Sequence, residues 1–435
     1  MRKISVRNAT AIGLGAIIGA GIFVLSGTAV ALAGPYSLFA FVLVGIVALI
    51  LAWIISELSS IMPKSEGASY SYAYNAFGSE IGFITGIALF ASFATAITAI
   101  SLGFGSYLAS LLGFGAGEAV PFAVLLILVL TGVNLLGVSK AAKTDFVLVA
   151  IKLSVLVIFG LFAVYFAAKT GFASTVVNFA TKGYKLGSIF AASVAIFFAY
   201  SGFQTIATLS SRVEGGPKGT AKAIIGAVAI SLAVYVLIDL SLMLLAPASA
   251  YTIAADPLAF ALRASKAPRA MDIVVDLGAL VATTSATLAM ILSSARLSYQ
   301  ISKDKLLPGI LRKYNAARDV PVNGVLLAAF IGIITLFAGN IYVIAAISNF
   351  GLMLSYLIAC LAQIHFRRQH ANASVRMPLY PYLTVVAIIL LLVFLIGMPK
   401  EALVIGTALV FSLLILYYFF RELQGKKPVK IKLFN

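Results

Sequence analysis

Twelve apolar segments of about 20 residues follow one another along the chain, and they constrain its fold more than any other feature. Each segment is long enough to cross a hydrocarbon core of about 30 Å as an α-helix. Proline, glycine and charged residues mark the connections between the segments. The sequence therefore predicts an all-α integral membrane protein with 12 transmembrane helices. The segments are 9–33, 38–62, 81–111, 119–137, 146–168, 187–211, 221–246, 272–298, 322–338, 341–366, 379–397 and 401–420.

The composition excludes an ordinary soluble domain. The chain is 62% hydrophobic and 10% charged, whereas a soluble domain is about half apolar and about a quarter charged. The first apolar segment follows three basic residues, as the core of a signal peptide does. Because eleven further segments come after it, we interpret it as a retained first span. The single Cys360 excludes an intramolecular disulfide. The sequence has no HExxH motif, phosphate-binding loop or Cys/His cluster, so we expect no metal, no cofactor and no catalytic residue.

The positive charges fall mainly on one side of the predicted membrane. When the N-terminus is placed in the cytoplasm, 23 of the 31 Lys and Arg residues lie on the cytoplasmic side and 7 lie in the outer loops. This asymmetry is typical of cytoplasmic loops and predicts that both termini lie inside a multi-pass cell-membrane protein. A cytoplasmic face that meets anionic lipid explains the net charge of +17 better than nucleic-acid binding does. We expect no nucleic-acid partner.

Two of the predicted spans contain an interruption near their middle. The first is "GAIIGAGIF", Gly15 to Phe23, and the second is "FFAYSGFQT", around Ser201 and Gly202. Glycine weakens a helix by roughly 0.5–1 kcal/mol relative to alanine. An unwound backbone is tolerated at membrane depth only where it lines a cavity or packs against protein. One alternative is that these glycines only allow close helix packing, as small residues often do in membranes.

The positions of the two interruptions favour a binding site. They fall in spans 1 and 6, which are corresponding members of two five-span sets, and each is followed at nearly the same distance by a Gly-Pro pair. Interrupted segments at matching positions of two halves are typical of an inverted-repeat transporter. We divide the chain into a first repeat at 1–170, a second at 185–367, two extra helices at 378–421 and a cytoplasmic basic tail at 422–435.

Three motifs resemble those of the amino acid–polyamine–organocation (APC) transporters. "GAIIGAGIF" is similar to the first-span signature of that family. "ELSSIMPKSEGASYSY", from Glu57 to Tyr72, and "ARLSYQISKDKLLP", from Ala295 to Pro308, are similar to the motifs that follow spans 2 and 8. The number and order of the spans match over nearly the whole chain. The resemblance implies a LeuT-type fold, which is a 5+5 inverted repeat with helices 1 and 6 discontinuous and two extra helices. It also implies an amino acid or a related amine as substrate.

An amino acid carries a carboxylate and an ammonium, and the two interruptions can bind both. The N–H groups that open the second half of span 1 favour an anion, so we assign the carboxylate to them. The free carbonyls that end the two first halves can accept from the ammonium. The glycines would let the ligand approach the backbone, and nearby aromatic rings could cover the ligand side chain or simply pack. The predicted substrate-binding residues are Ile17, Ile18, Gly19, Ala20, Gly21, Ile22, Phe23, Phe198, Ala199, Ser201, Gly202 and Phe203.

Lys152 lies inside span 5 at membrane depth, where an ionisable residue is a functional hypothesis by default. Burial favours the neutral form of a lysine, so this residue is a candidate for proton coupling. The alternative is a side chain that extends to the cytoplasmic interface. The resemblance implies that the ammonium occupies the place where sodium-coupled relatives hold an ion, between spans 1 and 8. The acceptors that we expect there are carbonyls near Gly15 or Ile18 and the span-8 residues Thr284, Ser285 and Thr287.

Other polar residues carry weaker predictions. We expect Asp239 to hydrogen-bond a neighbouring helix, although a role in a proton relay is an alternative. Glu57 and Arg296 lie near helix ends and are candidates for structural or gating ion pairs, whereas His365 and His370 resemble surface residues.

The sequence is most typical of a secondary transporter of amino acids that is proton-coupled, sodium-independent and works by alternating access. An exchanger of amino acids or polyamines, with Lys152 as a fixed structural cation, is the alternative. Gln204 stands where relatives selective for cationic substrates often have an acid, which favours a neutral substrate. A membrane enzyme is disfavoured because no polar catalytic cluster is evident. A channel is disfavoured because the sequence has no repeated filter or charged ring.

Overall fold

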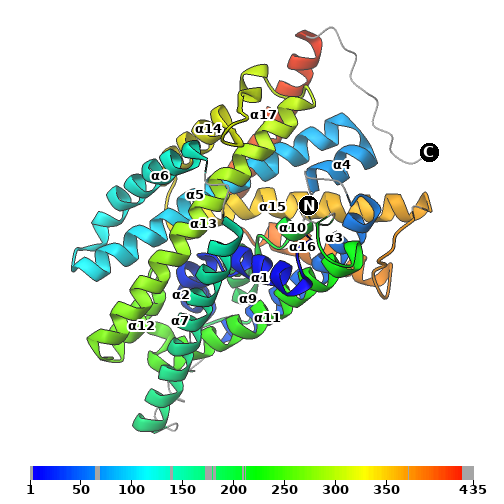
Figure 1. Ribbon diagram of the computed structural model, residues 1–435. Helices are drawn as coiled ribbons and strands as arrows, with labels where there is room; N and C mark the ends of the chain where they lie inside the picture. Colours follow the sequence, from blue (N-terminus) through cyan, green and yellow to red (C-terminus); the bar gives the residue numbers. More distant parts are fainter. Residues whose placement is uncertain are drawn as a thin grey trace.

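The computed structural model describes residues 3–63, 69–137, 141–171, 183–207, 212–370 and 372–423, together with Phe179 and Ser210. Within these ranges the protein is built mainly from α-helices (Figure 1), together with short 3₁₀ turns and one antiparallel pair of two-residue strands. Most of the predicted basic tail at 422–435 lies outside the described residues, because the description ends at 423.

The helices follow the order of the predicted apolar segments. In the first half they are α1 (Val6–Ile17), α2 (Gly21–Ala33), α3 (Ser37–Ile61), α4 (Ser69–Phe77), α5 (Ser79–Leu112), α6 (Ala119–Leu136) and α7 (Ala141–Thr170). In the second half they are α9 (Ser188–Phe197), α10 (Gln204–Ala207), α11 (Gly216–Leu245), α12 (Pro257–Ala264), α13 (Arg269–Lys303), α14 (Val322–Ile334), α15 (Ile341–Arg368), α16 (Tyr382–Ile396) and α17 (Lys400–Leu423). The two strands are β1 (Tyr314–Asn315) and β2 (Val320–Pro321), and the 3₁₀ turn that matters below is η4 (Phe198–Tyr200).

The described residues contain nine helical stretches that are long and apolar enough to cross a membrane. Three differences explain why this number is below the predicted twelve. The stretch Gly21–Ile61 joins the second half of predicted span 1 to span 2, while Val322–Phe337 and Tyr382–Ile396 are apolar but shorter. The chain is thus a multi-span, all-helical membrane protein, and the count of twelve stays a prediction.

Two helices fall where the sequence predicted only connections. These are α4, between spans 2 and 3, and α12, between spans 7 and 8. They have only 9 and 8 residues, so a search for apolar segments of about 20 residues does not detect them. Helix α12 packs on α2, where Pro257 lies against Gly27.

The long helices pack in pairs that relate the two halves of the chain. Helix α3 packs against α11, α5 against α13, and α6 against α14, and the last pair lies at the upper left of Figure 1. Helix α7 packs against α1, α11 and α13, whereas α15 packs against α9, α3 and α5. These three contacts of α15 correspond to the three contacts of α7 when the two five-span sets are exchanged.

Segments that the sequence placed on one side of the membrane contact one another. The Ile4 N–H donates to the Arg212 carbonyl at 2.8 Å, and the Glu214 N–H donates to the Ile4 carbonyl at 2.8 Å. The Tyr70 hydroxyl, on α4, donates to Asp304 at 2.6 Å. Each contact joins two segments that the charge pattern predicts on the same side of the membrane: the N-terminus with the connection before α11, and α4 with the end of α13. Which side is cytoplasmic stays a prediction.

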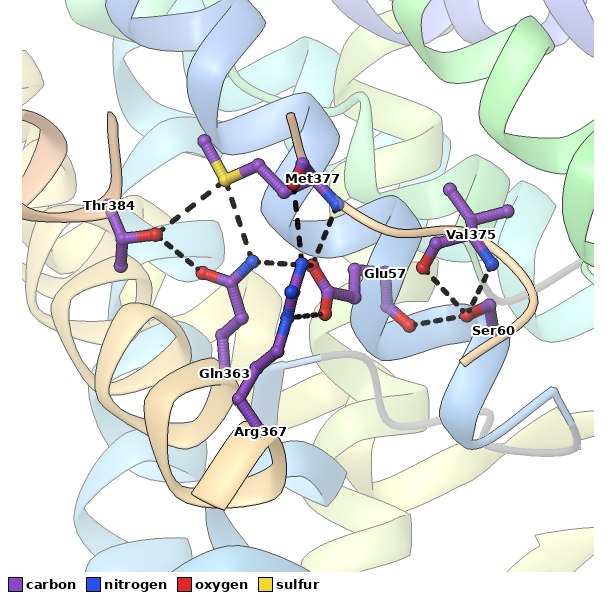
Figure 2. Close-up of polar contacts among 7 residues, drawn as sticks. All are labelled: Glu57, Ser60, Gln363, Arg367, Val375, Met377 and Thr384. Atoms are coloured by element: carbon purple, nitrogen blue, oxygen red, sulfur yellow. Dashed lines mark hydrogen bonds and ion pairs between the residues drawn. The ribbon is translucent and has the colours of Figure 1, made fainter. Parts of the chain in front are cut away.

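Glu57, near the end of α3, forms a buried ionic network (Figure 2). Its carboxylate pairs with the Arg367 guanidinium of α15, and it accepts from the Gln363 amide at 2.7 Å and from the Met377 N–H at 3.0 Å. The network joins the end of α3 to the end of α15 and to the segment that follows it. The predicted ion-pair role of Glu57 is confirmed as a contact, and its partner is Arg367.

The predictions for Arg296 and His370 agree with the structure, whereas the prediction for His365 does not. Arg296 forms an exposed ion pair with Asp319 at 3.4 Å, so it lies apart from the Glu57 network. His370 is exposed as expected, but the prediction for His365 is wrong. His365 is only 9% exposed, because it lies on the face of α15 that packs on α4, where its ring is 5.4 Å from that of Phe77.

Candidate functional site

The first interruption separates α1 from α2. Helix α1 ends at Ile17, and α2 begins at Gly21 after a short non-helical segment. The residue before α2 is Ala20, and no side chain in the described part of the chain hydrogen-bonds the N-terminus of that helix. The first N–H groups of a helix have no partner within the helix. The backbone N–H groups at the start of α2 are therefore directed at the interruption without a competing side-chain cap.

The second interruption separates α9 from α10. Helix α9 ends at Phe197 and tightens into the 3₁₀ turn η4, after which Ser201 is extended, with φ −64° and ψ 155°. Gly202 follows with φ +105°, a conformation that glycine adopts readily and other residues avoid. The Ser201 hydroxyl turns back and donates to the Phe198 carbonyl at 2.7 Å. The chain thus changes direction at the two residues where the sequence placed the interruption.

The two interruptions lie against each other inside the protein. A Cβ atom at Gly21 would lie 2.4 Å from the Ala199 Cα, and a Cβ atom at Gly202 would lie 2.6 Å from the Ala16 carbonyl oxygen. Both distances are too short for a real side chain, so glycine is required at both positions by backbone packing. Close packing was the alternative interpretation of these glycines, and the structure shows that they do allow it.

The predicted site residues gather at this contact, and nearly all of them are buried. Ser201 is half-buried and the other eleven predicted binding residues are buried. Helices α1, α9 and α10 lie near the middle of the view in Figure 1, among the longer helices. The arrangement brings the N-terminal end of α2 close to the C-terminal ends of α1 and η4. Helix N-termini carry partial positive charge and C-termini partial negative charge, so the site offers both signs of charge without an ionised side chain.

Tyr235 of α11 is a site residue that the sequence analysis missed. Its hydroxyl lies 2.9 Å from the Ile17 carbonyl oxygen and 2.8 Å from the Ala199 carbonyl oxygen, and its side chain is fully buried. These two carbonyls end α1 and lie in η4. A single hydroxyl therefore connects the two interrupted segments. In the sequence Tyr235 was one aromatic residue within an apolar span, with no motif around it to distinguish it from a packing residue.

The aromatic residues near the site make defined ring contacts. The Phe203 ring stacks on Tyr356 of α15, with centroids 5.4 Å apart and an interplanar angle of 7°. The Tyr200 ring packs edge-on against Tyr235 at 4.9 Å. Gln204 accepts a hydrogen bond from the Ser69 hydroxyl at 3.1 Å, which ties the start of α10 to α4. Packing, the alternative left open for the aromatic residues, is therefore what the structure shows for the rings of Tyr200 and Phe203.

Lys152 is buried in the protein, with a relative exposure of 2%. Its ammonium donates to the Gly15 carbonyl of α1 at 3.4 Å. The alternative of a side chain extended to the interface is therefore wrong, because the side chain points from α7 to α1. One of the acceptors expected on span 1 is present.

The predicted partners of Lys152 on span 8 lie on α13, against which α7 also packs. Thr287 is fully buried, with its hydroxyl 3.4 Å from that of Ser101, while the Ser285 hydroxyl donates to the Ala282 carbonyl at 3.0 Å. Thr284 is half-buried. A Cβ atom at Gly19 would lie 3.3 Å from the Ala286 Cβ, so the first interruption borders this part of α13. A contact between Lys152 and these three residues stays a prediction.

Asp239 is fully buried in α11. The Ser37 hydroxyl, at the start of α3, lies 2.9 and 3.0 Å from its two carboxylate oxygens. The expected hydrogen bond to a neighbouring helix is confirmed, and it fastens α3 to α11.

Comparison with known proteins gives consistent results. A family model described as amino acid permease matches residues 4–420. A methylthioribose transporter of Bacillus subtilis (strain 168) is 28% identical and covers 92% of this chain and 88% of its own. The branched-chain amino acid permease BcaP of Lactococcus lactis subsp. cremoris (strain MG1363) is 29% identical and covers 87% of this chain and 86% of its own. The cationic amino acid transporter 2, vacuolar, of Arabidopsis thaliana is 26% identical and covers 84% of this chain and 60% of its own.

A solved structure shows a shared fold. The crystal structure of a mutant of the Eremococcus coleocola manganese transporter superposes with a TM-score of 0.61 over 95% of this chain and 93% of that chain, at 14% sequence identity.

Proposed function

The chain belongs to the amino acid permease family of the APC superfamily, and we propose that it transports amino acids across the cell membrane by alternating access. Proteins of this family are permeases and not enzymes. Transport by this chain would depend on a defined substrate site, a fold with opposed repeats and a buried lysine.

One structural feature supports the location of the substrate site. The uncapped N-terminus of α2 and the carbonyls of Ile17 and Ala199 converge on one buried place. An amino acid is a zwitterion, so its carboxylate matches the N–H groups of Ala20 to Ile22 and its ammonium matches the carbonyls. Backbone groups therefore recognise the part that all amino acids share. The ligand side chain would be left to the surrounding apolar and aromatic residues.

The paired contacts support a LeuT-type fold with 12 transmembrane helices, in which helices 1 and 6 are discontinuous. The segments α1–α2 and α9–α10 are helices 1 and 6 of two five-span repeats. The exchange of contacts between α7 and α15 is the relation expected between the last helices of such repeats. An odd number of spans in each repeat gives the two copies opposite orientations. The site then lies between the repeats, as in other transporters built this way.

Lys152 supports proton coupling as the driving force. Its ammonium is buried against the backbone of α1, one turn before the interruption. Loss of a proton would remove the charge that the Gly15 carbonyl stabilises, so protonation and the position of α1 are coupled. The same contact also supports the alternative, an exchanger in which Lys152 remains charged and only holds α1 in place. A sodium ion is not required by either mechanism.

The names of the relatives point to different substrates, so the substrate side chain that this protein prefers must be measured. They include a branched-chain amino acid permease, a cationic amino acid transporter and a methylthioribose transporter. Gln204 is neutral and is held by Ser69, and the rings around Gly202 are uncharged. A neutral amino acid fits this environment better than a dibasic one, because none of the described residues named at this site is a carboxylate that could pair with a second cation.

Uptake into proteoliposomes tests the proposed function. Purified protein is reconstituted, and uptake of labelled leucine, arginine and methylthioribose is measured with and without an inwardly directed proton gradient. We expect concentrative leucine uptake that requires the gradient, and weaker uptake of arginine. Uptake that requires internal amino acid but no gradient would select the exchanger. Uptake of methylthioribose alone would overturn the amino-acid proposal.

A further inference from the structure

Tyr235 occupies the position that the proposed site gives to the substrate ammonium. Its hydroxyl lies within 2.9 Å of the Ile17 carbonyl and within 2.8 Å of the Ala199 carbonyl. Both carbonyls belong to the backbone that ends before an interruption. A ligand that donates to these two oxygens must therefore lie beside the Tyr235 hydroxyl.

The two carbonyls offer more hydrogen-bonding capacity than Tyr235 can use. A tyrosine hydroxyl has one proton to donate, and its oxygen can also accept. At any moment it can donate fully to only one of the two carbonyls, which leaves the other with an incomplete set of partners. An ammonium has three N–H donors. It can donate to the free carbonyl and to the tyrosine oxygen while the tyrosine proton remains on the other carbonyl.

The ring of Tyr235 is held in place by its neighbours. The Tyr200 ring packs against it edge-on at 4.9 Å, and the Phe41 ring packs against it at 6.3 Å and 68°. The Tyr200 hydroxyl in turn lies 3.3 Å from the Phe41 carbonyl. Because the side chain is fully buried in this cluster, the hydroxyl cannot leave the two carbonyls without repacking three aromatic rings. It therefore stays in the site when a ligand binds.

We propose that Tyr235 is a specificity-determining residue that recognises the ammonium of the substrate by accepting one of its hydrogen bonds. This inference rests on the proposed amino-acid site and names a side chain that distinguishes amines from other ligands there. A ligand with a hydroxyl in place of the ammonium has one donor and no charge, so it gains little from the same arrangement. Removal of the phenolic oxygen should therefore weaken amine ligands selectively.

The test compares two ligands on three proteins. Binding of leucine and of its α-hydroxy acid analogue is measured by competition against labelled leucine, in wild type, Tyr235→Phe and Tyr251→Phe. Tyr251 is a matched control because its buried hydroxyl donates to the carbonyl of Leu242, which lies on α11 about two turns beyond Tyr235. We expect Tyr235→Phe to weaken leucine binding by about 10-fold or more, since a hydrogen bond to a charged group is worth about 1.5–3 kcal/mol. The hydroxy acid should change by less than about threefold, and Tyr251→Phe should leave both ligands near wild type.

A failure of the Tyr235 role can be distinguished from a failure of the proposed function. If wild type binds no amino acid, the proposed function fails before Tyr235 is tested. If wild type binds leucine and Tyr235→Phe binds it equally well, or loses both ligands by the same factor, then Tyr235 does not recognise the ammonium. Thermal unfolding monitors the fold of each variant. Should Tyr235→Phe not fold, Tyr235→Gln supplies the same comparison, because its amide both donates and accepts and should recover part of the preference for leucine.

Discussion

Replacing Gly202 with alanine is expected to abolish amino acid uptake. The residue has φ +105°, and an added Cβ would lie 2.6 Å from the Ala16 carbonyl oxygen. A strained backbone of this kind costs about 1–3 kcal/mol, and the clash can be relieved only if α1 and α10 move apart. That movement would displace the Ile17 carbonyl from the site. Since a shift of about 1 Å in a binding geometry can cost about 100-fold in rate, we expect at least this loss in proteoliposome uptake.

Gly216→Ala is the matched control for this prediction. Gly216 also has positive φ, at +57°, but an added Cβ there would meet none of the described residues within 4 Å. This variant should suffer only the backbone cost, about 1–2 kcal/mol, and should retain substantial uptake. If both variants lost uptake equally, strain alone would explain the result. If Gly202→Ala transported normally, the contact between the two interruptions would not matter for function.

Replacing Lys152 with methionine is expected to remove the dependence of uptake on the proton gradient. Methionine keeps most of the side-chain volume but lacks the charge and the donor to the Gly15 carbonyl. A buried carbonyl left without its partner costs about 1–3 kcal/mol, so we also expect slower uptake, by about tenfold. The measurement is initial uptake of labelled leucine as a function of external pH, in wild type and variant.

Lys169→Met controls for the loss of a positive charge on the same helix. Lys169 lies near the exposed end of α7, and its replacement should leave both the rate and the pH profile unchanged. A Lys152→Met protein that exchanges amino acids but no longer concentrates them would indicate proton coupling. A variant with wild-type uptake and an unaltered pH profile would rule out coupling through this lysine.

The architecture could be predicted from the sequence because it is encoded locally. Each apolar segment must satisfy its own backbone hydrogen bonds in a membrane, so its length and composition indicate a helix without reference to the rest of the chain. The same holds for the interruptions, since glycines in an apolar span are conspicuous. The structure places these residues at the ends of α1, α2 and η4. The short helices α4 and α12 were missed because their stability depends on the surfaces that they cover.

Contacts between distant segments could be predicted only in part. The sequence indicated that Glu57 and Lys152 would find partners, because buried charges need them. It could not indicate Arg367 as the partner of Glu57, which is 310 residues away. Nor could it distinguish Tyr235 from the other aromatic residues, because its role depends on two carbonyls that come together only in the fold. His365 was placed wrongly for the same reason, since the helix that covers it was not expected.

A structure of the protein with bound leucine would test directly whether the two interruptions form the amino-acid site. The expected result is a leucine whose carboxylate lies within about 3.2 Å of the N–H groups at the start of α2, next to Gly21. Its ammonium should lie at the same range from the carbonyls of Ile17 and Ala199. Leucine bound elsewhere, or a carboxylate paired with a basic side chain and not with the start of α2, would contradict this.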